Sequence, residues 1–448
     1  MNAQSKTVVV GAGFSGLMTC ANLIRLGYPG RLTLIERTSR PARGVAYDPP
    51  SELLLLNVPA SRMGAWPDKP ADFHTWLASH GKSVDPAAYV PRRWYGDYLA
   101  DLHSTLTREA AGRFETTTGD AVNASHAGGR WSVKLDSGAS YDGDHLVLAL
   151  GNLRPGPPPN LNPRPDAPWW CPEPWDQHTH RPCRPGERVL VIGTGLTMAD
   201  VCISLSASGA RPRLTVLSRH GLLPLVHAGN MLKPGTATAP PPGSTVMQIF
   251  RHVRREANRL TREGCDWRAA IDVLRASTPA IWNALSTRDR ERFLSHLRTR
   301  WDVHRHRVPA DVLARLVELH QRGDLRILGG RISSATDRGN EVDIHWTRRG
   351  GERPGSGTFD RVINCTGART SIDASPLLQS IKAAGLIESE DLGLGIRTDP
   401  VGRALSAGRP SPNVWAIGPL RRGTLWESTA VPELRGQALE LAKAIAAA

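Results

Sequence analysis

The stretch Thr7-Val-Val-Val-Gly11-Ala-Gly13-Phe-Ser-Gly16 decides the fold of this chain. It joins a β-branched run, typical of a buried strand, to a Gly-x-Gly-x-x-Gly turn, and a helical pattern follows from Leu17 to Leu26 before Gly27. A second apolar run, Leu32–Glu36, ends in an acid. Strand, glycine turn, helix, strand and acid in this order predict a Rossmann-type dinucleotide-binding unit, with an ordinary glycine-rich turn as the alternative.

The three glycines of this fingerprint have separate tasks. Gly11 permits a sharp turn, Gly13 lets the backbone approach a pyrophosphate, and Gly16 lets the helix pack closely on the strand. The positive end of the helix favours the pyrophosphate, and Glu36 would accept hydrogen bonds from a ribose. The residues predicted to contact a cofactor in this unit are Gly11, Gly13, Phe14, Ser15, Gly16, Glu36 and Arg37.

Length and composition limit the class of protein. The 448 residues allow two or three domains, and the absence of an 18-residue apolar run predicts no transmembrane helix. The fingerprint begins where the apolar part of a signal peptide would still be running, so no signal is expected. Six scattered cysteines without Cys-x-x-Cys favour reduced thiols over a disulfide or zinc framework. We therefore expect a cytoplasmic protein without a metal site and with no membrane partner.

The chain is strongly basic. Its formal charge is +14, and 49 of its 56 basic residues are arginine. This bias has two interpretations, namely an arginine-rich coding preference or attraction of an anionic cofactor, substrate or nucleic acid.

The region after the first unit changes character twice. Residues 40–100 form an apolar, aromatic-rich excursion, and residues 114–150 alternate like short strands that stop at Gly151. Residues 153–186 are rich in proline and contain Trp169, Trp170 and Trp175, so we interpret them as a linker between domains.

The fingerprint is then repeated as Arg188-Val-Leu-Val-Ile-Gly193-Thr-Gly195-Leu-Thr197-Met198. A helix is expected to run from it to about Ser208, and Leu214–Ser218 supplies the following strand. Met198 stands at the third glycine position, which predicts a helix that lies less close to its strand. We expect Gly193, Gly195 and Thr197 to contact a second dinucleotide.

The acid of the first unit has no counterpart in the second. Glu36 lies 25 residues after Gly11, and the same offset from Gly193 reaches Ser218, which Arg219 follows. An acid would repel a 2′-phosphate, whereas Ser218 and Arg219 can bind one, so NADPH is preferred over NADH. The alternative is that Arg219 is a solvated loop residue.

A basic helical insertion interrupts the second unit at residues 222–320. Val246, Ile249, Phe250, Val253 and Leu260 share one helix face, and Thr278-Pro279 has the pattern of an N-cap followed by N1. Residues 221–310 contain 15 Lys+Arg and 7 Asp+Glu, a net of +8. This segment lacks the aromatic interleaving of a stacking surface, so no specific nucleic acid is expected, although a nucleic-acid-associated role stays open.

Glycine-terminated strands return after the insertion. One run ends Asn-Cys-Thr-Gly367, another reads Val-Trp-Ala-Ile-Gly418-Pro, and a last helix starts near Pro432. The predicted fold class is α/β, with two Rossmann-like dinucleotide-binding domains, β-meanders and a helical insertion in the second. The predicted divisions are 1–157 for the first part of one dinucleotide-binding domain, 158–366 for the other dinucleotide-binding domain, and 367–448 for the C-terminal part of the first domain.

This arrangement resembles the two-dinucleotide-binding-domain flavoproteins over most of the chain. The resemblance implies FAD at the first fingerprint and NAD(P)H at the second, with Gly151 and Gly367 in the crossing segments between domains. Gly418 matches a Gly-Asp segment that contacts the flavin ribityl chain, but Pro419 replaces the acid here.

Further motifs resemble a bacterial family of FAD/NAD(P)-binding proteins related to flavin-containing monooxygenases. They are Gly-Val-Ala-Tyr47, Leu-Asn57-Val-Pro59, Trp-Asp-Val-His-Arg305-His-Arg307-Val-Pro and Leu-Trp426-Glu-Ser-Thr-Ala-Val-Pro. The resemblance implies that Asn57 lies beside the flavin and supports its oxygen chemistry, and that Trp426 contacts the cofactor. The chain has no Cys-x-x-Cys of a disulfide reductase and no Baeyer–Villiger motif.

The resulting prediction is an FAD-dependent, NADPH-preferring oxidoreductase. A monooxygenase that acts through an oxygenated flavin on a small molecule is favoured, and the charge is compatible with an anionic substrate. The alternatives are a non-oxygenating flavin reductase and a tRNA-modifying or nucleic-acid-associated flavoprotein. The run of His304, Arg305, His306 and Arg307 has two interpretations, an anion clamp or a solvated basic helix end.

Overall fold

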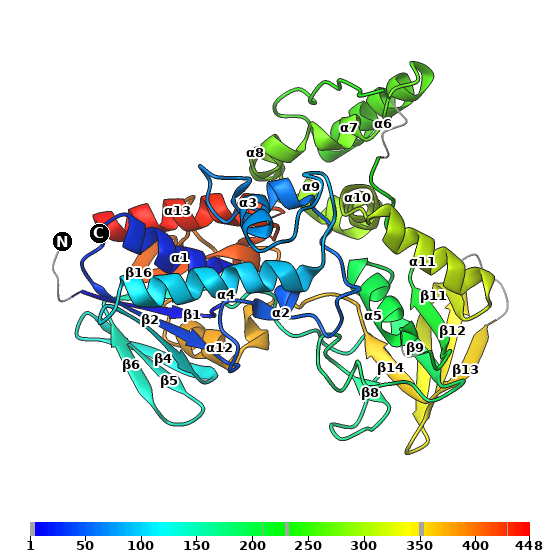
Figure 1. Cartoon of the computed structure of the whole chain (residues 1–448), viewed down its shortest axis with the longest axis horizontal. Helices are drawn as coiled ribbons and strands as arrows, with labels where there is room; N and C mark the ends of the chain where they lie inside the picture. Colours follow the sequence, from blue (N-terminus) through cyan, green and yellow to red (C-terminus); the bar gives the residue numbers. More distant parts are fainter. Residues whose placement is uncertain (1–4, 208, 229–232, 349–353, 428) are drawn as a thin grey trace.

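The structure is a computed structural model that describes residues 5–207, 209–228, 233–348, 354–427 and 429–448. Its two main sheets lie side by side, each with helices against it (Figure 1). Among the residues described, no helix is long and apolar enough to cross a membrane. All six cysteines are free thiols, and five of them are buried.

The first sheet combines both ends of the chain. Its strand order is β15-β16-β7-β1-β2-β3. The central strands β7, β1, β2 and β3 are parallel, and β16 pairs in parallel with β7. The C-terminal segment thus completes the sheet that the first fingerprint begins. The strands are β1 (Lys6–Val10), β2 (Arg31–Glu36), β3 (Phe114–Thr118), β7 (His145–Leu148), β15 (Arg403–Ser406) and β16 (Arg409–Ala416).

Helices cover one face of this sheet and a meander covers the other (Figure 1). Val9 and Leu34 pack against the helices, whereas Val8 and Ile35 pack toward the meander, because successive strand residues face opposite sides. The helix side contains α1 (Phe14–Arg25), α2 (Gly44–Tyr47), η1 (Ala60–Arg62), α3 (Asp72–Ser79), α4 (Arg92–Glu109) and α13 (Val431–Ala447). The meander side contains β4 (Ala121–Ala127), β5 (Arg130–Leu135), β6 (Ser140–Gly143), η4 (Ile372–Ala374) and α12 (Pro376–Ala383).

The second sheet contains the second fingerprint. Its order is β13-β12-β11-β10-β9-β14-β8, with the five strands from β11 to β8 parallel. The helices α5 (Leu196–Ser206) and α11 (Ala310–Gln321) pack on one face. The strands are β8 (Trp170–Cys171), β9 (Arg188–Ile192), β10 (Arg213–Ser218), β11 (Leu325–Asp337), β12 (Val342–Arg348), β13 (Gly355–Phe359) and β14 (Arg361–Asn364). Helix α5 ends at Ser206, and Ser208 lies outside the described residues.

The proline-rich segment is more than a linker. Its residues Trp170–Cys171 form the edge strand β8, which pairs with β14, and the N–H of Val362 donates to Trp169 O at 2.7 Å. Trp169 is buried in the core on the face of the second sheet opposite to α5 and α11. A two-residue strand between prolines has no periodicity of its own, so the sequence pattern did not predict it.

The insertion consists mostly of helices, of which α6 and α7 extend away from both sheets (Figure 1). The predicted N-cap at Thr278 is wrong: Ser277 precedes helix α8, and Thr278 Oγ1 donates to Leu274 O at 2.8 Å. The chain is already helical through η2 before Thr278, so the threonine is inside the helix. The insertion's helices are α6 (Val246–Arg262), α7 (Ala269–Asp272), η2 (Arg275–Ser277), α8 (Thr278–Ala284), α9 (Thr287–Arg292), η3 (Phe293–Leu297) and α10 (Arg298–Arg305).

Candidate dinucleotide and active site

The first fingerprint forms an open cradle at the carboxyl end of β1. A Cβ at Gly11, where φ is +102°, would overlap Ala149 O in the segment that follows β7. A Cβ at Gly16 would overlap Gly11 O, so helix and turn are in direct contact. At Gly13 a Cβ would meet only Gly44 Cα, at 3.6 Å. Gly11 and Gly16 are therefore needed for packing, and Gly13 leaves the space that a pyrophosphate requires.

The start of α1 fits an anion. The helix begins at Phe14, its N-cap Gly13 makes no side-chain cap, and its first turn carries no acid, so helix N–H groups remain for a phosphate. Phe14 is buried, Ser15 is half-buried and Arg37 is exposed. The residues therefore fit the pyrophosphate of FAD.

Glu36 is held at the end of β2 beside this turn. Its Oε2 accepts the Ala12 N–H at 3.0 Å, and its Oε1 accepts the Thr38 N–H at 3.2 Å. The carboxylate thus lies at the carboxyl edge of the sheet, next to the cradle, where a ribose hydroxyl would reach it.

The second fingerprint repeats the geometry. A Cβ at Gly193, where φ is +113°, would overlap Cys365 O, and at Gly195 nothing lies within 4 Å of such an atom. Thr197 is half-buried in the first turn of α5, and Met198 is buried. In both units, therefore, the first glycine of the fingerprint contacts a segment from elsewhere in the chain. That segment ends at Gly151 in the first unit and at Gly367 in the second, and both of these glycines have a positive φ.

Ser218 and Arg219 lie at the carboxyl end of β10. Ser218 Oγ accepts hydrogen bonds from Thr194 Oγ1 at 2.9 Å and from the Gly221 N–H at 3.0 Å. Arg219 is exposed and forms no hydrogen bond or ion pair with another described residue. Its guanidinium is thus available to a phosphate beside the second cradle.

Asn57 lies where the first unit meets the second. Its backbone oxygen is 3.0 Å from His227 Nε2, and the His227 ring stacks on Tyr89 at 5.0 Å. The backbone N–H of His227 donates to Val308 O at 3.0 Å. Burial lowers the pKa of His227, which favours its neutral form. The Asn57 side chain makes no hydrogen bond to any residue described.

Arg307, whose charge acts on His227, has a side-chain nitrogen that makes no hydrogen bond within the described residues. Its side chain is 7% exposed, its Nη1 lies 3.0 Å from Asp272 Oδ2, and its Nε donates to His304 O. Its Nη2 is buried without a hydrogen-bond partner. Arg305 is half-buried, with its Nε 2.8 Å from Glu427 Oε2. The interpretation as a solvated basic helix end is therefore wrong for both arginines.

The insertion docks on the segment that precedes α13. Trp426 stacks on Trp282 at 4.7 Å and is buried there, and Trp282 Nε1 donates to Gly423 O at 2.7 Å. Arg275 binds Glu433 in the first turn of α13 at 2.8 Å. The structure thus places Trp426 in a contact between the insertion and the C-terminal segment, and its contact with a cofactor stays a prediction.

Gly418 opens the short helix η5 (Gly418–Arg421) with φ at +75°. Its N–H donates to Gln437 Oε1 of α13 at 3.3 Å. Pro419 occupies the position of the acid, and the carboxamide of Gln437 supplies a polar group from the last helix instead.

The sequence patterns missed two features of the site. One is the close approach of Gly44 to Gly13, for which the glycine in Arg43-Gly-Val-Ala-Tyr47 was a signal. The other is an ion pair between the two units, in which Arg92 Nη2 lies 2.8 Å from Asp200 Oδ2. Burial raises the pKa of Asp200 to about 6, although the charge of Arg92 opposes the shift. An acid inside the apolar run Met198–Ile203 was the available signal.

Comparisons with known proteins agree with this geometry. Residues 8–153 match a family model described as FAD-NAD(P)-binding. No curated protein matches the chain at the sequence level. The fold is similar to that of ornithine hydroxylase from Pseudomonas aeruginosa, with 16% identity, 99% of each chain covered and a TM-score of 0.67.

Two further structures similar to this chain contain the expected cofactors. Ornithine N-hydroxylase from Kutzneria sp. 744, described with reduced FAD, NADP⁺ and L-ornithine, has 15% identity, 99% coverage of each chain and a TM-score of 0.67. The cadaverine monooxygenase of Erwinia amylovora, bound to FAD, has 12% identity over 100% of this chain and 95% of its own, with a TM-score of 0.64. Residues 8–153 thus form an FAD/NAD(P)-binding domain, and the fold of the chain as a whole is similar to the folds of these hydroxylases.

Proposed function

We propose that this protein is an FAD-dependent, NADPH-preferring monooxygenase that acts on a small molecule in the cytoplasm. The observation that carries the proposal is the pair of equivalent open cradles at Gly13 and Gly195, each at the carboxyl end of a Rossmann sheet. Two such cradles in one chain suit a nucleotide that donates hydride and a flavin that accepts it. The six free cysteines support a reducing compartment.

The cofactors supply the electron transfer and the activation of oxygen when they are bound. The residues of the chain bind, orient and shield them. Glu36 and the start of α1 hold the nucleotide part of the flavin, and Ser218 and Arg219 select the nicotinamide cofactor. The Asn57 loop, which His227 contacts from the second unit, positions a carboxamide where the two units meet.

An anionic group on the substrate is supported by Arg307. Its buried Nη2 lacks a partner, and its charge acts on Tyr89, which stacks on His227 beside Asn57. A buried guanidinium donor without an acceptor is costly, and a carboxylate or phosphate of a ligand would satisfy it. The proteins of similar fold are an ornithine hydroxylase and a cadaverine monooxygenase, and these names support a small-molecule substrate for this chain.

The visible spectrum and the oxygen dependence of NADPH oxidation test the proposal together. We expect a yellow protein with flavin absorbance that oxidises NADPH in air and releases hydrogen peroxide when no substrate is present. A flavoprotein that reduces an artificial electron acceptor equally well in air and under nitrogen, and consumes no oxygen, would instead be a non-oxygenating reductase. A protein that takes up no flavin would contradict the proposal.

Replacing Arg219 with alanine should raise the Michaelis constant for NADPH and leave that for NADH nearly unchanged. A hydrogen bond to a charged group contributes roughly 1.5–3 kcal/mol, which corresponds to about 10- to 150-fold. Steady-state kinetics with both nucleotides measures the effect. Arg251→Ala, an exposed arginine on α6 far from β10 in the sequence, is the control and should change neither constant. Equal losses with NADPH and NADH would show that Arg219 has a structural role.

Replacing Asn57 with alanine should keep the flavin bound and accelerate hydrogen peroxide release in air by about tenfold. The estimate corresponds to one lost hydrogen bond of about 1.4 kcal/mol between the carboxamide and activated oxygen. The contact with His227 uses the backbone oxygen of Asn57, so alanine preserves it and the variant reports on the side chain alone. An unchanged rate of peroxide release would leave Asn57 as a structural turn residue.

A further inference from the structure

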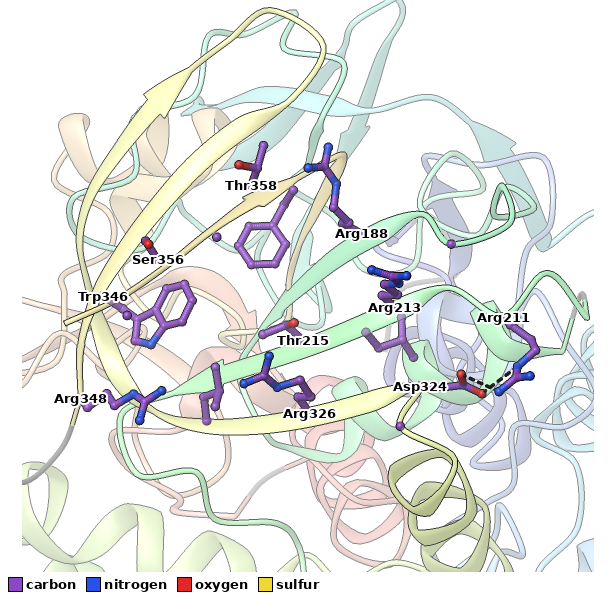
Figure 2. A pocket seen from close by; sticks show the side chains of 17 residues that line it. Arg188, Arg211, Arg213, Thr215, Asp324, Arg326, Trp346, Arg348, Ser356 and Thr358 are labelled. Carbon is purple, nitrogen blue, oxygen red and sulfur yellow. Dashed lines mark hydrogen bonds and ion pairs between the residues drawn. The ribbon is translucent and has the colours of Figure 1, made fainter. Parts of the chain in front are cut away.

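A further concave site lies along one face of the second sheet, from the amino ends of β9 and β10 to Leu328 of β11 and Arg348 of β12. The cavity measures about 840 Å³ and is lined by the first residues of β9 and β10, by the start of β11, and by β12 and β13 (Figure 2). Arg213 begins β10 and Ser218 ends it, so at about 3.3 Å per residue the two positions are roughly 17 Å apart. Arg213 and Arg326, the latter beside Thr215, therefore lie in the amino-terminal half of these strands, away from the dinucleotide cradle at the carboxyl ends.

Arginines dominate the cavity. Arg188, Arg211, Arg213, Arg326 and Arg348 line it, against the single acid Asp324, and Figure 2 shows their side chains around one space. Two of these arginines are neutralised. Arg188 lies 2.8 Å from Asp360 Oδ1, and Arg211 lies 3.2 Å from Asp324 Oδ1.

Arg213 and Arg326 carry charges that no described residue balances. Both are exposed, and neither side chain forms an ion pair or hydrogen bond with another residue in the described part of the chain. The register places Arg213 beside Arg188 and Arg326 beside Thr215, on the same face of the sheet. Like charges on adjacent strands repel each other, and an anion between them would offset the repulsion.

The cavity also offers neutral donors. Trp346 is 6% exposed, and its Nε1 is buried without a hydrogen-bond partner. Its ring extends into the space that Arg326 and Arg348 share (Figure 2). A Cβ at Gly355 would overlap this indole, so the glycine is required to seat it. The hydroxyls of Thr215 and Ser356 line the same cavity.

We infer that this cavity binds a small diphosphate-bearing anion at a site distinct from both dinucleotide cradles. Guanidinium groups bind phosphate oxygens in a bidentate manner, and a diphosphate has enough oxygens to contact Arg213 and Arg326 together. The volume is that of a small-molecule site. Inorganic diphosphate and the diphosphate of a nucleotide share this chemistry.

The test is calorimetric titration of the FAD-loaded protein with inorganic diphosphate, in about 0.15 M salt and saturating NADP⁺. Saturation fills the dinucleotide sites, so binding that remains reports on the cavity. We expect one saturable site, weakened about tenfold or more by Arg213→Ala and by Arg326→Ala, and less by Trp346→Phe. Both arginines are exposed and unpaired, so these variants should fold, which circular dichroism verifies.

Arg251→Ala is the control, because Arg251 is exposed on α6 and has no partner among the described residues. It should leave diphosphate binding unchanged. An equal loss in this variant would show attraction by net charge alone and overturn the proposal, as would an absence of saturable binding at millimolar diphosphate. Tighter binding of ADP than of inorganic diphosphate identifies a nucleotide as the occupant, and the reverse order identifies free diphosphate. An oligonucleotide that alone saturates the cavity would contradict a small-molecule site.

Discussion

A Gly13→Val variant should purify without FAD, whereas the wild-type protein retains it. The cradle at Gly13 is open, and a Cβ there would meet only Gly44 Cα at 3.6 Å. The methyl groups of valine would therefore occupy the space of the pyrophosphate without preventing the fold. The loss of two hydrogen bonds between helix N–H groups and the pyrophosphate, at roughly 1.5–3 kcal/mol each, should raise the dissociation constant of FAD by about 100-fold or more.

Gly195→Val provides a matched control for this prediction, because nothing lies within 4 Å of a Cβ at that position in the second cradle. It should keep FAD and lose NADPH, while Gly13→Val loses FAD. Flavin absorbance per protein after gel filtration and titration of each variant with NADP⁺ measure both effects. A Gly13→Val protein with a full complement of flavin would refute the assignment of the first fingerprint.

An Arg361→Met variant should lower the free energy of unfolding by about 3–5 kcal/mol. Arg361 and Glu187 have completely buried side chains, and Arg361 Nη2 lies 2.8 Å from Glu187 Oε1. Arg361 Nη1 also donates to Thr179 O at 3.0 Å, which ties the proline-rich segment to the second sheet. Methionine fills the volume of the arginine side chain but removes its positive charge, so the buried carboxylate of Glu187 loses its main ion-pair partner. Arg181, at 2.9 Å, still neutralises part of the carboxylate charge.

Urea titration measures this loss, with Arg338→Ala as the control. Arg338 pairs with Asp343 at 2.9 Å on an exposed surface, so its removal should cost less than about 1 kcal/mol. Burial alone would raise the pKa of Glu187, but the Arg184 N–H and the guanidinium of Arg361 outweigh it and lower the pKa. The stability that this lowered pKa provides is complete above the ordinary carboxyl range and is lost as pH falls through the lowered value. The gap between wild type and Arg361→Met should therefore narrow in acid, and an equal gap at low and neutral pH would contradict this account.

The sequence was sufficient for features that depend on local chain geometry. Gly11 and Gly193 each require a positive φ and a close backbone neighbour, so both turns could be located from their glycines and the β-branched strands before them. The start of α13 beside Pro432 was predicted for the same reason, since proline suits the first turn of a helix. The Rossmann architecture and the family model at residues 8–153 confirm this part of the prediction.

The sequence by itself thus determined two Rossmann-type units and the positions of their glycine turns, because a strand, a glycine turn and a helix within about thirty residues specify their own geometry. Only the tertiary structure decided how the units meet. The contact of His227 with Asn57 and the ion pair between Arg92 and Asp200 join residues more than a hundred positions apart. The same holds for Arg213 and Arg326, whose charges share one cavity because β10 and β11 are adjacent and parallel. Pairings across such separations depend on which surfaces pack together, and no local pattern in a single sequence encodes them.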